Sequence, residues 1–162
     1  MQLLWRGRND EFIWKRDNAA SDVNKLAGQD DTVRTVLIFH KGWDISKQEE
    51  YVYKFHHQRL SALKPNQISI SGIKLTRVED DVIIVAFLRN SIDKAIRFDI
   101  VDLLLVDGDG KLLAKKTFDL TELGEIPALS SMPWRFLFEE GYILAESIPD
   151  EGWKIAFEWK RK

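Results

Sequence analysis

The sequence predicts a mainly β protein: an Ig-like antiparallel β-sandwich with one amphipathic helix on its N-terminal side. Three observations predict this fold. After Pro65, apolar and polar residues alternate in several short runs, which is the period of half-buried strands. An Asp-Gly turn sequence at residues 107–110 lies between two of these runs and is typical of a β-hairpin. A helical pattern is confined to residues 46–63. Short strands at close spacing with turns between them favour a sandwich.

Residues 1–32 are predicted to form an N-terminal arm that is partly ordered. The stretch 17–31 is rich in Asp, Asn, Gln, Ala and Gly, a composition typical of loops. Two short apolar runs precede it, Leu3-Leu4-Trp5 and Phe12-Ile13-Trp14. These runs are too apolar to act only as a spacer, so we expect them to dock on the domain or on a partner. The domain itself is expected to span residues 33–162.

The predicted helix at residues 46–63 has a clear start and a clear stop. Ser46 and Glu49 have the spacing of a capping box, in which each side chain bonds the other residue's backbone amide. Lys64-Pro65 ends the helix, because a residue before proline avoids helical geometry. The residues that share its apolar face are Val52, Phe55 and Leu63, flanked by Tyr51 and Leu60.

The strands of the β-sandwich are predicted between residues 67 and 160, with a further short strand at 33–39. In the first strand of the sandwich the inward set changes parity at Gly72, which predicts a β-bulge. Residues 82–88 are nearly all apolar and fit a central strand that is covered on both faces. The aromatic residues expected to face the core are Trp134, Phe136, Phe138, Trp153, Phe157 and Trp159.

Charge and composition exclude several classes of protein. The 162 residues contain 24 Lys and Arg against 26 Asp and Glu, a net charge of −2, so the chain is not a globally basic nucleic-acid binder. No apolar run approaches the roughly 20 residues of a membrane span, and the first ten residues become charged too early for a signal peptide. Cysteine is absent, which excludes a disulfide framework and thiolate chemistry. We therefore expect a cytoplasmic protein without a nucleic-acid partner or an integral membrane segment.

The residue patterns do not predict catalysis. His56 and His57 are adjacent on the helix and point about 100° apart, so they cannot both face one metal ion. The acidic turn at 107–110 resembles the start of a calcium loop, but Lys111 stands where a ligand is needed. Glu79-Asp80-Asp81 fits a solvated turn between two strands. No phosphate-binding glycine loop or nucleophile elbow occurs. We expect no catalytic residue, no metal site and no cofactor, and therefore no enzyme.

Several segments of the sequence together carry a resemblance to a known family. They are Val36-Leu37-Ile38-Phe39-His40-Lys41-Gly42-Trp43, Glu49-Glu50-Tyr51-Val52-Tyr53, Leu63-Lys64-Pro65-Asn66-Gln67-Ile68-Ser69-Ile70-Ser71-Gly72-Ile73, Val85-Ala86-Phe87-Leu88-Arg89-Asn90-Ser91, Lys116-Thr117-Phe118-Asp119-Leu120-Thr121-Glu122-Leu123-Gly124-Glu125-Ile126-Pro127 and Pro133-Trp134-Arg135-Phe136. In these segments the chain resembles the SLAP domain of the accessory Sec system S-layer assembly proteins of Bacillus-type Gram-positive bacteria. The similarity covers residues 36–159, about three quarters of the chain.

The resemblance implies a non-enzymatic cytoplasmic factor that works with a second SecA ATPase in the secretion and assembly of S-layer proteins. It implies a protein partner, either a secretion ATPase or an S-layer-type client, and offers no catalytic residues. The assembly proteins carry this domain twice, whereas it occurs once here. The single copy leaves self-association as a homodimer open.

The aromatic residues that lie outside the clean strand pattern are the candidates for a partner surface. We predict that five of them face a partner: Trp43, Tyr51, Tyr53, Trp5 and Trp14. Large amphipathic rings of this kind dominate the energetics of protein interfaces. Exposed aromatic rings also suit a ligand- or glycan-binding β-sandwich module, and this remains the alternative to an export-assembly factor.

Overall fold

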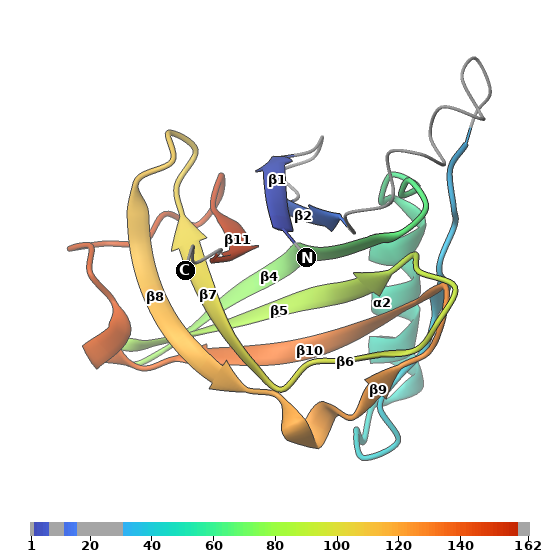
Figure 1. Ribbon diagram of the computed structural model, residues 1–162. Coiled ribbons are helices and arrows are strands. Elements are labelled where there is room, and N and C mark those ends of the chain that lie inside the picture. The colour runs from blue at the N-terminus through green and yellow to red at the C-terminus, as the bar shows by residue number, and fades with distance from the viewer. Residues whose placement is uncertain (1, 7–11, 16–30, 159–162) are drawn as a thin grey trace.

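The computed structural model describes residues 2–6, 12–15 and 31–158 (Figure 1). The strands and helices in chain order are β1 (Gln2–Arg6), β2 (Phe12–Lys15), β3 (Val36–Leu37), α2 (Lys47–Gln58), β4 (Gln67–Val78), β5 (Asp81–Asn90), β6 (Ile96–Arg97), β7 (Ile100–Val106), β8 (Leu112–Asp119), the 3₁₀ helix η2 (Thr121–Leu123), β9 (Glu125–Ile126), β10 (Ser130–Phe138), the 3₁₀ helix η3 (Glu140–Tyr142) and β11 (Lys154–Phe157). Over these described residues, the prediction of a mainly β fold with one α-helix is confirmed.

The strands form one large sheet and two smaller ones. The large sheet has the strand order β1-β2-β4-β5-β10-β3, and the second sheet has the order β11-β7-β8, while β6 and β9 pair separately. The long strands β4, β5 and β10 are antiparallel neighbours. β3 departs from the predicted antiparallel pattern, because it runs parallel to β10. Figure 1 shows the second sheet curling over one face of the large sheet and α2 crossing its other face.

The core lies between the two larger sheets, and β5 is its centre. The even-numbered residues of β5, including Ile84 and Leu88, are fully buried in this core, together with Phe136 of β10 and Phe157 of β11. On the opposite face of the same strand, Val85 and Phe87 are buried with Tyr53 of α2. The prediction that residues 82–88 are covered on both faces is therefore confirmed.

The predicted bulge and the predicted hairpin turn are both present. The register of β4 on β5 shifts between Gly72 and Lys74, so one residue of β4 lacks a partner and the inward set changes parity. At the β7–β8 turn, one carboxylate oxygen of Asp107 accepts hydrogen bonds from the backbone amides of Asp109 and Lys111, each at 2.9 Å. These bonds explain the acidic cluster at 107–110 as turn chemistry.

The helix begins as predicted and ends earlier than predicted. The Ser46 side chain accepts from the Glu49 amide and the Glu49 carboxylate accepts from the Ser46 amide, which completes the capping box. The helix stops at Gln58, and Leu63 instead exchanges two backbone hydrogen bonds with Val33. This bridge fixes Leu63 in an extended conformation, which the helical pattern of 46–63 did not predict.

Most of the aromatic residues predicted for the core lie there. Phe136, Phe138 and Phe157 are fully buried, and Trp134 and Trp153 are partly buried against the same cluster. Trp159 lies outside the described residues. Within the part of the chain that the structure describes, no helix has the length and apolar character needed to cross a membrane.

Candidate functional site

The helix α2 is fixed to the large sheet by an aromatic cluster. Tyr53 is the buried residue of the helix, with 9% of its surface exposed, and its ring meets Phe87 of β5 edge-on at a centroid distance of 6.5 Å. Phe39 and Trp43 pack against Tyr53 at 5.9 and 6.0 Å. Burial raises the pKa of the Tyr53 hydroxyl, so the group is neutral at physiological pH. The helix is thus packed firmly on the large sheet through this face.

A small polar cluster also holds α2 in place. The hydroxyl of Thr35 lies 3.2 Å from Nε2 of His57 and 2.5 Å from the hydroxyl of Ser131 on β10. The imidazole of His57 also meets the edge of Phe87 at 5.5 Å. Burial, reinforced by the positive charges of Arg89 and Arg34, lowers the pKa of His57. A neutral imidazole therefore links the helix to the sheet near neutral pH.

Trp43 covers the free side of β10. The strand β3 pairs with β10 only at Ser130 and Ser131, so the rest of β10 needs another cover. Trp43 stacks on Trp134 at 5.7 Å with 12° between the rings, and the guanidinium of Arg135 lies 4.4 Å from the Trp43 ring centroid. The chain after β3 thus turns around the sheet edge and closes it with an aromatic stack.

Three large hydrophobic side chains of α2 are exposed, and we call them the α2 ridge: Tyr51, Val52 and Phe55. Their exposed fractions are 71%, 45% and 47%. The guanidinium of Arg59 lies 5.2 Å from the Phe55 ring and lengthens the ridge by one helical turn. Exposed apolar residues at i and i+4 on one helix are the usual anchors of helix-mediated recognition.

A pocket of about 320 Å³ lies beside the ridge, between α2 and the large sheet. Its walls are Gln48, Glu49, Val52, Tyr53 and His56 of the helix, Ile73 and Lys74 at the bulge of β4, and Val85 of β5. Burial lowers the pKa of His56, as does the nearby charge of Arg59, so its imidazole adds no charge to this wall near neutral pH. The ridge and the pocket form one apolar surface bordered by charged side chains.

The five residues predicted to face a partner fall into three groups. Tyr51 is in the α2 ridge. Tyr53 lies under the helix and Trp43 is half-buried at the sheet edge, so these two rings meet each other in the aromatic cluster. Trp5 belongs to β1 and Trp14 to β2, and the side chains of both lie outside the described part of the structure.

The apolar face identified in the helix sequence is not the face that packs on the sheet. Val52 and Phe55 of that face are exposed, while Tyr53 and His57 contact Phe87 of the sheet. The polar partner of His57 and the aromatic partners of Tyr53 decide the orientation. Val52 and Phe55 belong to the α2 ridge because they are exposed. The sequence indicated them only as members of an apolar pattern in the helix.

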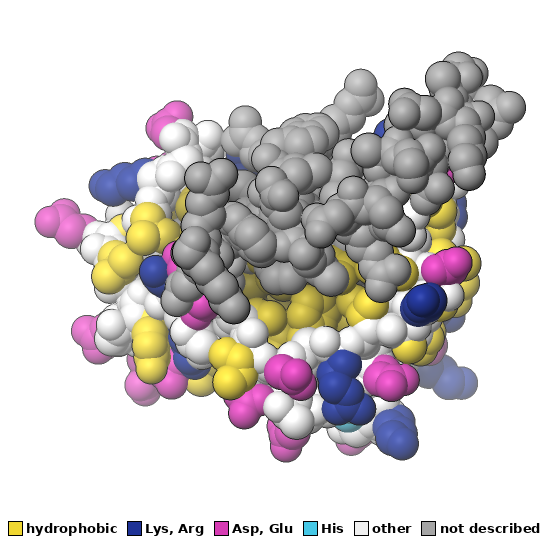
Figure 2. Space-filling view, in the orientation of Figure 1, with side chains coloured by type: hydrophobic (Ala, Val, Ile, Leu, Met, Phe, Trp, Pro, Cys, Tyr) yellow, Lys and Arg dark blue, Asp and Glu magenta, His cyan; other side chains and the backbone are white. Residues whose placement is uncertain are grey.

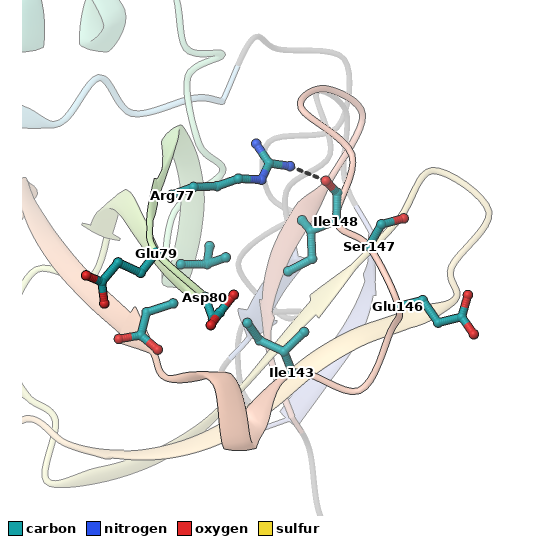
Figure 3. A pocket seen from close by; sticks show the side chains of 9 residues that line it. Arg77, Glu79, Asp80, Ile143, Glu146, Ser147 and Ile148 are labelled. Atoms are coloured by element: carbon teal, nitrogen blue, oxygen red, sulfur yellow. Dashed lines mark hydrogen bonds between the residues drawn. The ribbon is translucent and has the colours of Figure 1, made fainter.

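A second pocket of about 320 Å³ is bordered by acidic residues, and it does not form a converging site (Figure 3). Glu79 and Glu146 lie on opposite sides of it, while the guanidinium of Arg77 is bonded to the Ile148 carbonyl and to Asp150. Asp81 accepts a hydrogen bond from the Glu140 amide at 2.9 Å. Across residues 31–158 and the two described N-terminal strands, no group of three His, Cys, Asp or Glu residues is arranged to hold a metal ion.

Comparison with known proteins identifies the domain. A family model described as the SLAP domain matches residues 37–159, which takes in the structure from the last residue of β3 through β11. No curated protein matches the chain, and no solved structure does. The match leaves out the β1–β2 hairpin and covers the large sheet from β4 onward, the second sheet and α2. The chain belongs to the SLAP domain family.

Proposed function

We propose that this chain is a non-enzymatic protein-interaction factor that acts in the cytoplasm in the export and assembly of surface-layer proteins. Its partner in this proposal is a SecA-type secretion ATPase or an S-layer-type export client. The α2 ridge carries the proposal, because it exposes Tyr51, Val52 and Phe55 on a helix whose opposite face is firmly packed. Membership of the SLAP domain family supports the export and assembly of surface-layer proteins as the process in which the chain acts.

The surroundings of the α2 ridge have the anatomy of a protein interface. The apolar centre adjoins a pocket that an aliphatic or aromatic side chain of a partner can fill. Charged residues of both signs surround it: Glu50 pairs with Lys54 at 3.8 Å, and Glu49 lies 4.0 Å from Arg135. A desolvated apolar centre with a polar rim gives affinity at the centre and selectivity at the border.

The experiment is photocrosslinking from the ridge in cells of the source organism. A benzophenone amino acid replaces Tyr51, and in a matched control it replaces Ile100 of β7, which is 68% exposed outside α2. We expect position 51 to crosslink a SecA-type ATPase or an S-layer precursor and position 100 not to. The double change Tyr51→Ser/Phe55→Ser should lower co-purification of that partner at least tenfold, whereas Ile100→Ser should not. Equal recovery from both positions, or crosslinks to the chain itself alone, would contradict the proposal; the latter favours a homodimer.

A glycan-binding module is the second candidate, and one pocket favours it. A cavity of about 310 Å³ lies between the bulge of β4 and the loop before β11, where the Trp153 ring and the carboxylates of Asp150 and Glu151 line it. An aromatic ring beside carboxylates suits the apolar face and the hydroxyls of a sugar. Quenching of tryptophan fluorescence by cell-wall oligosaccharides, lost in Trp153→Leu, would favour this function over protein binding.

A further inference from the structure

The N-terminal hairpin closes one stretch of the large sheet that the domain does not close by itself. β2 pairs antiparallel with β4 through four residue pairs, and β1 pairs with β2 alone. The hairpin lies outside the family match, and residues 16–30 join it to the domain. The sheet therefore gains its last two strands from a segment that does not belong to the SLAP domain.

Beyond Ile70, β4 is contacted by the loop that precedes β11. The ring of Trp153 lies against Gly72, so close that a Cβ there would meet ring carbons at 2.4 and 2.8 Å. Further along β4, Arg77 bonds Asp150 and the carbonyl of Ile148 in the same loop. Loop 148–153 thus packs on β4 beyond Ile70, over the core face at Gly72 and through the Arg77 side chain, whereas β2 pairs with the edge itself from Gln67 to Ile70. Open strand edges pair readily with other chains, so the pairing with β2 protects the protein from aggregation.

The backbone of β4 is ready to accept an extended chain where β2 now lies. Gln67 donates its amide to Ser91 and accepts from the Ser91 amide at 2.9 Å, so its polar groups point away from β2. Alternation along a strand then directs the amides and carbonyls of Ile68 and Ile70 toward β2. Removal of the hairpin would leave these four groups without a strand partner.

The sequence of the hairpin indicates which residue types suit a strand that pairs with this edge. Phe12 stands opposite Ile70, and Trp14 stands opposite Ile68. Ile68 and Ile70 are both core residues with 3% and 0% of their surface exposed. Figure 2 shows hydrophobic side chains in the middle of the molecular face, in the area where Figure 1 draws β5 and β10. An occupant of this edge therefore needs large apolar residues at alternate positions and few charges.

We infer that the first half of β4 is a strand-acceptor site for an extended, aromatic-rich segment of an unfolded export client, and that the β1–β2 hairpin is its built-in competitor. This inference rests on the proposed function for the identity of the client. Strand addition supplies affinity through main-chain hydrogen bonds, and alternate side chains supply selectivity. The hairpin holds the edge in the absence of a client, because its tether gives it a high local concentration. A client that pairs with Ile68 and Ile70 must displace β2.

The test uses one full-length protein in two redox states. In Ile13→Cys/Ser69→Cys the two cysteines stand directly opposite each other in β2 and β4, at a pair that alternation makes non-hydrogen-bonded and close. The natural chain has no cysteine, so the oxidised variant carries a single disulfide that locks the hairpin. The probe is a fluorescent peptide with the sequence of residues 1–17, read by anisotropy. We expect the reduced protein to bind it at least tenfold more tightly than the oxidised protein.

Two control peptides separate strand addition from adhesion. A peptide with Ser in place of Phe12 and Trp14 removes the alternate apolar residues. A peptide with an N-methyl group on the amide of Trp14 keeps the side chain but removes a backbone donor that the register directs at Ile68. Both should bind at least tenfold more weakly. Hydrogen exchange of the unmodified chain gives an independent measure: the amides of Ile68 and Ile70 should exchange at least tenfold faster than those of the β5–β10 ladder. Equal binding in both redox states, or protection equal to that of the ladder, would overturn the inference.

The outcome is distinguishable from failure of the proposed function. The ridge experiment depends on Tyr51 and Phe55, which lie on α2, whereas this test depends on β2 and β4. A redox-dependent peptide affinity without a ridge partner would support the acceptor site and leave the identity of its client to be found. If oxidation at low protein concentration yields disulfide-linked pairs of chains, the hairpin is exchanged between copies. The inference that the hairpin closes the edge of its own chain is then refuted.

Discussion

Replacement of Gly72 by alanine tests how the loop before β11 packs on β4. A Cβ at this position would lie 2.4 Å from Cζ3 and 2.8 Å from Cη2 of Trp153, well inside van der Waals contact, and 3.5 Å from Cγ2 of Ile155, an ordinary contact. The backbone of Gly72 does not have a positive φ, so its conformation suits any residue. The ring of Trp153 is therefore the reason for glycine here.

The size of the effect follows from two opposing contributions. Alanine in place of glycine in a strand gains about 0.5–1 kcal/mol of stability from reduced freedom of the unfolded chain. Forcing an extra methyl into a packed contact costs about 1–3 kcal/mol. We expect Gly72→Ala to lower the free energy of unfolding by about 1–2 kcal/mol, which corresponds to roughly 2–8 °C in Tm for a chain of this size.

The decisive comparison is a double-mutant cycle with Trp153→Leu. Without the ring, the added methyl keeps only the ordinary 3.5 Å contact with Ile155, so Gly72→Ala should become neutral or stabilise the protein by up to about 1 kcal/mol. Urea unfolding of the four proteins gives the coupling energy, and tryptophan emission reports whether the ring has moved. The same loss of stability in both backgrounds would refute the assignment of the Trp153 ring as the reason for glycine at position 72.

Three further predictions concern the docking of α2. Ser46→Ala removes the N-cap and should cost about 1 kcal/mol in urea unfolding; Ser46→Asp, which also caps, should cost little. Phe87→Ala empties the contact under the helix and should cost about 3–5 kcal/mol, with near-UV circular dichroism reporting the loss of aromatic packing. Burial and the charges of Arg89 and Arg34 lower the pKa of His57 below its ordinary 6.5. The contribution of neutral His57 to the free energy of unfolding is complete above pH 6.5. It is lost as the pH falls below 6.5, by at most about 1.4 kcal/mol per pH unit. His57→Gln should flatten the stability profile between pH 7 and 5, and an unchanged slope would contradict this assignment.

The local features of the fold were predictable from sequence. The capping box joins Ser46 and Glu49, so the start of α2 depends on four consecutive residues. The bulge at Gly72 follows from a change of parity within one strand, and the β7–β8 turn follows from the carboxylate of Asp107 and the glycines beside it. In each case the residues that decide the structure are near each other in the chain.

Features that depend on distant residues were not predictable. The helix ends at Gln58 because Leu63 bonds Val33, some thirty residues earlier, and nothing near Leu63 shows this. Tyr51 and Tyr53 are the same residue type two positions apart, yet one is exposed and the other is buried by Phe87. The candidate surface could therefore be placed on the helix from sequence, but its members could not be chosen.

The ridge and the acceptor edge meet at the bulge of β4. Ile73 and Lys74 line the pocket beside the ridge, and Gly72 lies between them and Ile70, where the pairing with β2 ends. A partner that fills this pocket thus touches the strand whose edge the hairpin closes. The bulge gives β4 an extra twist at this point, so the wall of the pocket and the end of the β2 pairing depend on one local feature of the backbone. We expect a partner that fills the pocket to change the affinity of the edge for the peptide of residues 1–17, and an affinity that is the same with and without that partner would show two independent sites.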